Sequence, residues 1–139
     1  MTGENMIEWQ ESYSVGVVQL DEQHKNLFQY SNDLEEGLKR RAVSKQTLEG
    51  ALKFLGNYVK YHFSDEESCM HQYVCPIAGK NKLAHQHFIE QYHMFQGLIT
   101  ESGDNEGILK DIHRFLEDWL LEHICKIDTQ LKSCILKSP

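Results

Sequence analysis

The segment LEGALKFLGNYVKYHFSDEE, residues 48–67, decides the fold of this chain. Its apolar side chains at positions 48, 52, 55 and 59 recur at steps of three and four residues, which is the spacing of one face of an α-helix. Continued at the same steps, the stripe reaches His62 and then Glu66, which are four residues apart and project from one face. The segment therefore predicts a helix whose apolar face continues into an imidazole and a carboxylate that point inward.

Three further segments show the same helical spacing. A first helix is expected to begin at Asp21 as its N-cap and to end near the basic residues 39–41, and the helix quoted above is expected to start after Ser44. A third helix follows Pro76, and a fourth follows the break at residues 102–104. The apolar stripes of these three helices are Leu27, Phe28, Leu34 and Leu38; Phe88, Tyr92, Phe95 and Ile99; and Ile108, Ile112, Phe115 and Trp119.

The short connections between these helices favour antiparallel neighbours. We therefore predict an all-α protein, an up-down-up-down antiparallel four-helix bundle that forms one domain over residues 1–139. An irregular N-terminal arm is expected at 1–20, the bundle at about 21–128, and an extension with a short C-terminal helix at 129–139.

Composition narrows the class of protein and its partners. The net charge of −7 argues against nucleic acid, and no run approaches the roughly 20 apolar residues of a membrane helix, so we expect no membrane insertion. The N-terminus lacks the pattern of a secretory signal, and the four cysteines form no CxxC pair. These features predict a cytoplasmic protein with free thiols.

The interior histidines indicate a metal site. The third stripe, extended backward from Phe88, passes through His85 and Asn81, the fourth continues to His123, and His24 lies one turn before the first stripe. Four imidazoles at one level would cost on the order of 1–3 kcal/mol each if they lacked partners. A shared metal removes this cost, and nitrogen and oxygen donors suit iron or manganese. The other histidines, His71, His87, His93 and His113, fall off the stripes and are expected at the surface.

Several motifs in the same order resemble bacterial hemerythrins, from about Trp9 to Asp128. They are Leu20-Asp21-Glu22-Gln23-His24-Lys25, then His62-Phe63-Ser64-Asp65-Glu66-Glu67, then His85-Gln86-His87-Phe88, and finally Trp119-Leu120-Leu121-Glu122-His123-Ile124 with Asp128. The resemblance implies a non-haem centre of two iron ions, bridged by two carboxylates and an oxo or hydroxo group, that binds molecular oxygen by two-electron transfer.

The resemblance also implies a role for each ligand. His24 and His62 would hold the iron with an open position for oxygen, and His85 and His123 the other iron, while Glu66 and Asp128 would bridge the two. Asp128 lies about 140° from His123 on an ideal α-helix, so its assignment rests on the resemblance alone. By the same matching, the oxygen pocket would be lined by Leu27, Phe63, Trp119, Leu120 and Ile124.

The chain departs from the family pattern at Asn81, where the family has a histidine. An asparagine carbonyl is a weaker ligand than imidazole. Three outcomes are open at this stage: a di-iron centre with a labile position, a loosely held metal, or a centre displaced toward one metal. A labile position should speed autoxidation, which suits a sensor better than a reversible carrier.

Three functions remain open from the sequence. The first is a non-enzymatic oxygen-binding domain, either a carrier or storage protein or the sensor input domain of a fused or partner signalling output domain. The second is a di-iron enzyme of the peroxidase or nitric-oxide reductase type, and the third is an iron-handling bundle with a degenerate site. The resemblance favours the first.

Overall fold

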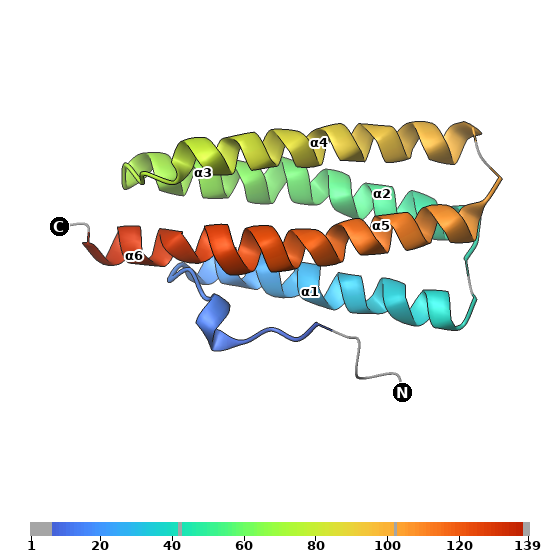
Figure 1. Cartoon of the computed structure of the whole chain (residues 1–139), viewed down its shortest axis with the longest axis horizontal. Coiled ribbons are helices and arrows are strands. Elements are labelled where there is room, and N and C mark those ends of the chain that lie inside the picture. Colours follow the sequence, from blue (N-terminus) through green and yellow to red (C-terminus); the bar gives the residue numbers. More distant parts are fainter. Residues whose placement is uncertain (1–6, 42, 102, 138–139) are drawn as a thin grey trace.

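Four long helical rods run side by side along the molecule (Figure 1). The computed structural model describes residues 7–41, 43–101 and 103–137, and within them it leaves out the side chains of 126–129, 136 and 137. The helical elements are η2 (Glu11–Tyr13), α1 (Val18–Lys39), α2 (Lys45–Asn57), η3 (Tyr58–Phe63), α3 (Ser64–Gln72), α4 (Ala78–Glu101), α5 (Asn105–Trp119), η4 (Leu120–Asp128) and α6 (Thr129–Lys137).

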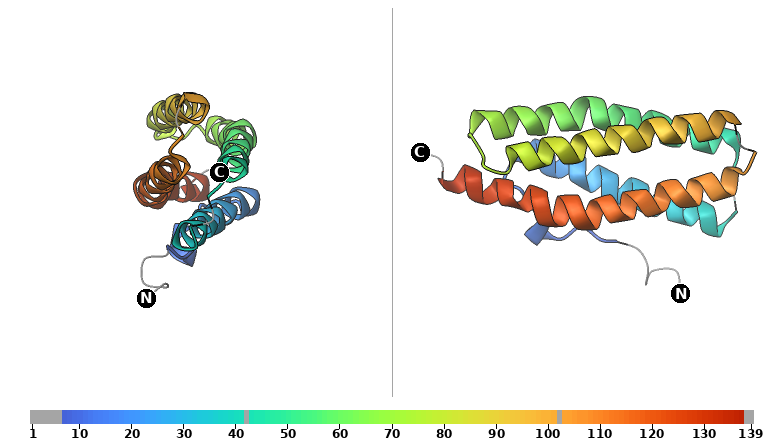
Figure 2. Two further views of the ribbon diagram at one scale, coloured as in Figure 1. Left: turned by 90° about the vertical axis from the view of Figure 1, so that its right-hand side faces the viewer. Right: turned by 45° about the horizontal axis from the view of Figure 1, so that its top comes forward.

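Consecutive rods are antiparallel, which confirms the predicted four-helix bundle. The second rod is α2, η3 and α3 in unbroken succession, and the fourth is α5, η4 and α6. Seen end-on, the four rods surround a common axis (Figure 2). The start of α1, the α3–α4 turn and α6 lie at one end of the bundle, and the α1–α2 and α4–α5 connections lie at the other.

The helix ends follow local capping chemistry, with one correction. Ser44 caps α2 in a reciprocal capping box with Thr47, and Asp104 caps α5 by accepting from the Gly107 N–H. Asp21 is not the cap of the first helix, because α1 already begins at Val18. The Asp21 carboxylate instead accepts hydrogen bonds from Ser14 Oγ at 2.6 Å and from the Val15 N–H at 2.8 Å, and so ties the arm to α1.

The short C-terminal helix is present, but it is not a separate element. Helix α6 continues η4 without a break, so the fourth rod extends past the expected boundary at residue 128. The two segments η3 and η4 are π-helical, with backbone bonds between residues five apart, which the apolar periodicity did not predict.

The apolar core consists of two clusters. The larger cluster fills most of the bundle and contains the predicted stripes; of these, Leu38, Leu52, Val59, Tyr92 and Phe115 are only partly buried. The smaller cluster lies at the α6 end and consists of Val15, Leu20, Met70, Cys75 and Leu131 with partly buried neighbours. On the first three rods the buried polar residues His24, Glu66 and Asn81 lie in sequence between members of the two clusters, and on the fourth rod His123 lies at the end of the larger cluster.

The prediction of four free thiols is wrong for one pair. Cys75, in the α3–α4 turn, forms a disulfide with Cys134 in α6, across 59 residues of sequence. Cys69 and Cys125 lie outside this bond. The disulfide joins two rods at the end of the molecule where the smaller cluster packs.

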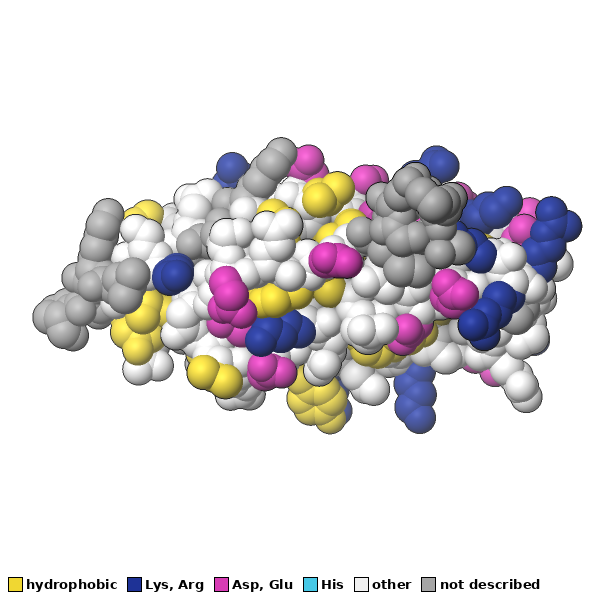
Figure 3. Space-filling model, turned by 90° about the horizontal axis from the view of Figure 1, so that it is seen from below, with side chains coloured by type: hydrophobic (Ala, Val, Ile, Leu, Met, Phe, Trp, Pro, Cys, Tyr) yellow, Lys and Arg dark blue, Asp and Glu magenta, His cyan; other side chains and the backbone are white. Residues whose placement is uncertain are grey.

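The surface in Figure 3 carries small, separate apolar spots among charged side chains. No described helix combines the length and hydrophobicity that crossing a membrane requires.

Candidate metal centre

Five buried side chains meet in one polar layer, and every rod contributes. His24 comes from α1, His62 from η3, Glu66 from α3, His85 from α4 and His123 from η4. All five are at most 3% exposed. The structure thus brings together five of the six ligands predicted from the sequence.

Glu66 lies at the middle of this group. Its Oε2 atom is 3.3 Å from His24 Nε2 and 3.3 Å from His62 Nε2, while those two nitrogens are 2.9 Å apart. Its Oε1 atom is 3.0 Å from His85 Nε2 and 3.9 Å from His123 Nε2. One carboxylate therefore joins two pairs of histidines, one pair at each oxygen.

The donor set fits two neighbouring metal ions. His24, His62 and Glu66 form one group of possible ligands, and Glu66, His85 and His123 form another, with the ligand atoms of each group within 4.8 Å of one another. Nitrogen and carboxylate donors of this kind bind iron, and facing helices of a bundle commonly hold such pairs.

The electrostatics of the layer point to a cation. Burial works to raise the pKa of Glu66, but contacts with the four imidazoles outweigh it and hold the pKa well below 4.5. The carboxylate is therefore charged although it is fully buried. A buried charge needs a compensating partner, and a metal shared with neutral imidazoles supplies one.

The outer nitrogens of two histidines are fixed by hydrogen bonds. His62 Nδ1 donates to Gln23 Oε1 at 2.5 Å, and Gln23 Nε2 donates in turn to Asp65 Oδ2 at 2.9 Å. His85 Nδ1 donates to Glu67 Oε2 at 2.7 Å. With Nδ1 as the donor, a neutral ring carries its lone pair on Nε2, which is the nitrogen that faces Glu66.

Aromatic rings cover the histidines from the side of the larger cluster. Tyr58 stacks on His62 with ring centroids 4.7 Å apart, and Trp119 stacks on His123 at 3.9 Å. The two aromatic residues are themselves joined, because Trp119 Nε1 donates to Tyr58 Oη at 3.2 Å. Phe63 stacks on His85 at 3.8 Å. These rings exclude water from one side of the layer and fix the imidazole planes.

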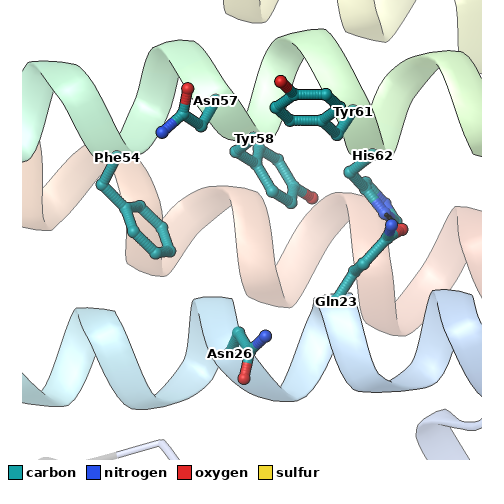
Figure 4. A pocket seen from close by; sticks show the side chains of 7 residues that line it. All are labelled: Gln23, Asn26, Phe54, Asn57, Tyr58, Tyr61 and His62. Atoms are coloured by element: carbon teal, nitrogen blue, oxygen red, sulfur yellow. Dashed lines mark hydrogen bonds between the residues drawn. The ribbon is translucent and has the colours of Figure 1, made fainter.

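A pocket of about 250 Å³ opens beside His62, between α1 and the second rod (Figure 4). Its lining is mostly polar and consists of Gln23, Asn26, Phe54, Asn57, Tyr58, Tyr61 and His62. Gln23 reaches from α1 toward the His62 ring, so its side chain stands between the pocket and the layer.

Comparison with known proteins decides the family. The Hemerythrin HHE cation binding domain matches residues 15–135. The chain belongs to the hemerythrin family. It is 29% identical to bacteriohemerythrin of Clostridium acetobutylicum over 132 residues, which cover 90% of this chain and 98% of that protein. It is 30% identical to a hemerythrin-like protein of Naegleria gruberi, and the match covers 91% of this chain and 92% of that protein. It is 28% identical to myohemerythrin of Sipunculus nudus, and the match covers 89% of each protein.

The sixth hemerythrin ligand predicted from the sequence, Asp128, has a side chain outside the described residues. Its backbone ends η4, whose π-helical bonds join residues five apart. Positions 123 and 128 therefore lie on one side of the rod, whereas an α-helix would separate them by about 140°. The separation of about 140° holds only for an α-helix, so it does not argue against Asp128 as a ligand in a π-helical segment.

Asn81 is fully buried in α4, one turn before His85. Neither its Oδ1 nor its Nδ2 atom has a hydrogen-bond partner in the described part of the chain. A buried polar atom left without a partner costs about 1–3 kcal/mol, so the Asn81 amide is a candidate to bind a group from outside the protein.

The remaining predicted residues occupy the expected kinds of position. The hemerythrin pocket residues Leu27, Phe63, Trp119, Leu120 and Ile124 are all buried in the larger cluster. His71, His87 and His93 are exposed, while His113 is partly buried beside Glu117, and none of the four belongs to the two ligand groups. Sequence reasoning did not find Gln23, Tyr58 or the role of Glu67. Only the helical spacing of Tyr58 and His62 hinted that these two side chains share a face.

Proposed function

We propose that this protein binds molecular oxygen at a non-haem di-iron centre and acts as an oxygen carrier or storage protein or as an oxygen or redox sensor input domain. The observation that carries the proposal is the position of Glu66, whose two oxygens each face a separate pair of histidines. Membership of the hemerythrin family supports it.

The ligands divide between the two ions as follows. His24 and His62 would hold the iron that binds oxygen, and His85 and His123 would hold the other. Glu66 and Asp128 would be the carboxylate ligands shared by the two. When bound, the two irons supply the electrons for oxygen binding.

Other side chains of the protein keep water away from the ions and orient the histidine ligands. Leu27, Phe63, Trp119, Leu120 and Ile124 form a dry oxygen pocket, which slows oxidation of the irons because water is kept out. Gln23 and Glu67 hold the His62 and His85 rings in the orientation that turns Nε2 toward the metal.

Metal content and the absorption spectrum test the proposal. The purified protein is expected to hold about two irons per chain and to change its spectrum reversibly on reduction and exposure to oxygen. His62→Ala should lose at least one iron, because it removes a ligand on the layer. His87→Ala is the matched control, since His87 is exposed two residues beyond His85 and should keep full iron content. Full iron and an unchanged spectrum in His62→Ala would rule out this ligand assignment.

The rate of autoxidation separates a carrier from a sensor. A carrier must keep its oxygen-bound state for long periods, whereas a sensor or a signalling input domain benefits from a state that decays quickly. We expect fast autoxidation, because Asn81 leaves the second iron short of one histidine.

A further inference from the structure

Asn81 is fully buried, and neither its Oδ1 nor its Nδ2 atom has a hydrogen-bond partner among the described residues. Asn81 lies in the first turn of α4, where its backbone N–H donates to the Ile77 carbonyl. His85 comes four residues later, so the two side chains project from the same face of the helix. An amide offers two N–H donors and a carbonyl acceptor. A small group beside the metal that accepts a hydrogen bond from the Asn81 N–H would satisfy this amide.

We propose that Asn81 lines a second exchangeable position of the centre, on the side of His85 and His123, and that this position takes a small anion held by the Asn81 amide. The proposal rests on the proposed di-iron function. Two histidines face each Glu66 oxygen, so the second ion has as few imidazole ligands as the first and equal reason to accept an outside ligand. The Asn81 N–H then provides a hydrogen bond to that ligand.

A pocket of about 300 Å³ offers a route to this position. It lies between α3 and the first turns of α4, and its lining is Glu67, Met70, His71, Ala78, Gly79 and Lys82. Glu67 connects the pocket to the layer through its bond with His85. Lys82 places a positive charge in the lining, opposite in sign to the Glu67 carboxylate, and is the group of the lining that attracts an anion.

Azide is the probe, because it is a small anion that binds ferric iron and gives a strong absorption band. The oxidised, iron-loaded wild-type protein is expected to bind two azide ions per iron pair. Asn81→His should bind one, since the imidazole fills the second position. Asn81→Leu should weaken the second azide about tenfold through the lost hydrogen bond, and leave the first within about twofold.

The outcomes separate the two proposals. A wild-type protein that holds no iron pair would overturn the proposed function itself. A wild-type protein with two irons that binds only one azide would overturn the second position alone, as would an Asn81→His protein that still binds two. For the route, Lys82→Glu should slow association of the second azide and not the first, and an equal effect on both would overturn it.

The metal-free protein gives a readout that does not depend on iron. Leucine has the same number of side-chain heavy atoms as asparagine and no polar atom to leave without a partner. Asn81→Leu should therefore raise the melting temperature of the metal-free protein. A lower melting temperature would show that the Asn81 amide serves a structural bond, and would overturn its assignment to a ligand.

Discussion

At the scale of single residues, the two sides of the centre have different outer supports. His62 donates to a neutral amide oxygen of Gln23, whereas His85 donates to the Glu67 carboxylate. A carboxylate makes the imidazole a stronger donor to metal than an amide does. In the proposed centre, the stronger support would therefore stand on the side of Asn81, where it would partly offset the ligand that Asn81 does not supply.

Replacing Glu67 with Gln should weaken metal binding on the His85 side by about 10–100-fold, because the outer hydrogen bond loses its charge. The measurement is a chelator competition that follows the two irons separately. Glu90→Gln is a matched control, because Glu90 is an exposed glutamate of α4, the helix that carries His85. If Glu67→Gln retains both irons equally, the Glu67 bond holds the His85 ring in place but does not strengthen metal binding.

At the scale of elements, the two π-helical segments decide which residues reach the layer. Segment η3 carries His62, and η4 begins after Trp119 and contains His123. Each segment is continuous with α-helix on both sides, so the local change of period rotates the downstream residues relative to an unbroken α-helix. His123 thus lies in a segment whose backbone bonds join residues five apart rather than four.

An alanine scan of residues 126–129 tests this period. If η4 is π-helical in solution, Asp128→Ala should remove at least one iron, because position 128 lies on the same side of the rod as His123. Lys126→Ala and Thr129→Ala should keep full iron. Full iron content in Asp128→Ala would instead indicate that position 128 does not share a side of the rod with His123, as in an α-helix.

Helical spacing in the sequence predicted which side chains converge in the core. Features that depend on contacts between distant parts of the chain could not be predicted from it. His24, His62, Glu66 and His85 follow apolar stripes of α-helical period, and their convergence could be predicted from that spacing alone. Asp128 could not, because no local pattern marks a π-helical segment. The roles of Gln23 and Glu67 depend on which rods are neighbours, and so does the bond between Cys75 and Cys134, whose partners are 59 residues apart.

At the scale of the whole molecule, the disulfide reinforces the end that has the smaller apolar cluster. It closes a long loop that contains α4, α5 and η4, and a bond of this kind restricts the unfolded chain. Its contribution to the free energy of unfolding is expected to be about 2–4 kcal/mol.

The double variant Cys75→Ser/Cys134→Ser should lose this contribution in chemical denaturation, and reduction of the wild-type protein should lose the same amount. The variants Cys69→Ser and Cys125→Ser are controls that keep the bond. Denatured, unreduced protein should show two reactive thiols out of four cysteines. Four reactive thiols would contradict the pairing.

The division of the apolar core into two clusters has a consequence for assembly. The larger cluster joins all four rods through apolar side chains, so this part of the bundle can form without a bound metal. The smaller cluster has far fewer apolar side chains and is separated from the larger one by charged and polar groups. The half of the bundle with the larger cluster can therefore form from apolar contacts alone, whereas the end with the smaller cluster is held together by the covalent bond between the α3–α4 turn and α6.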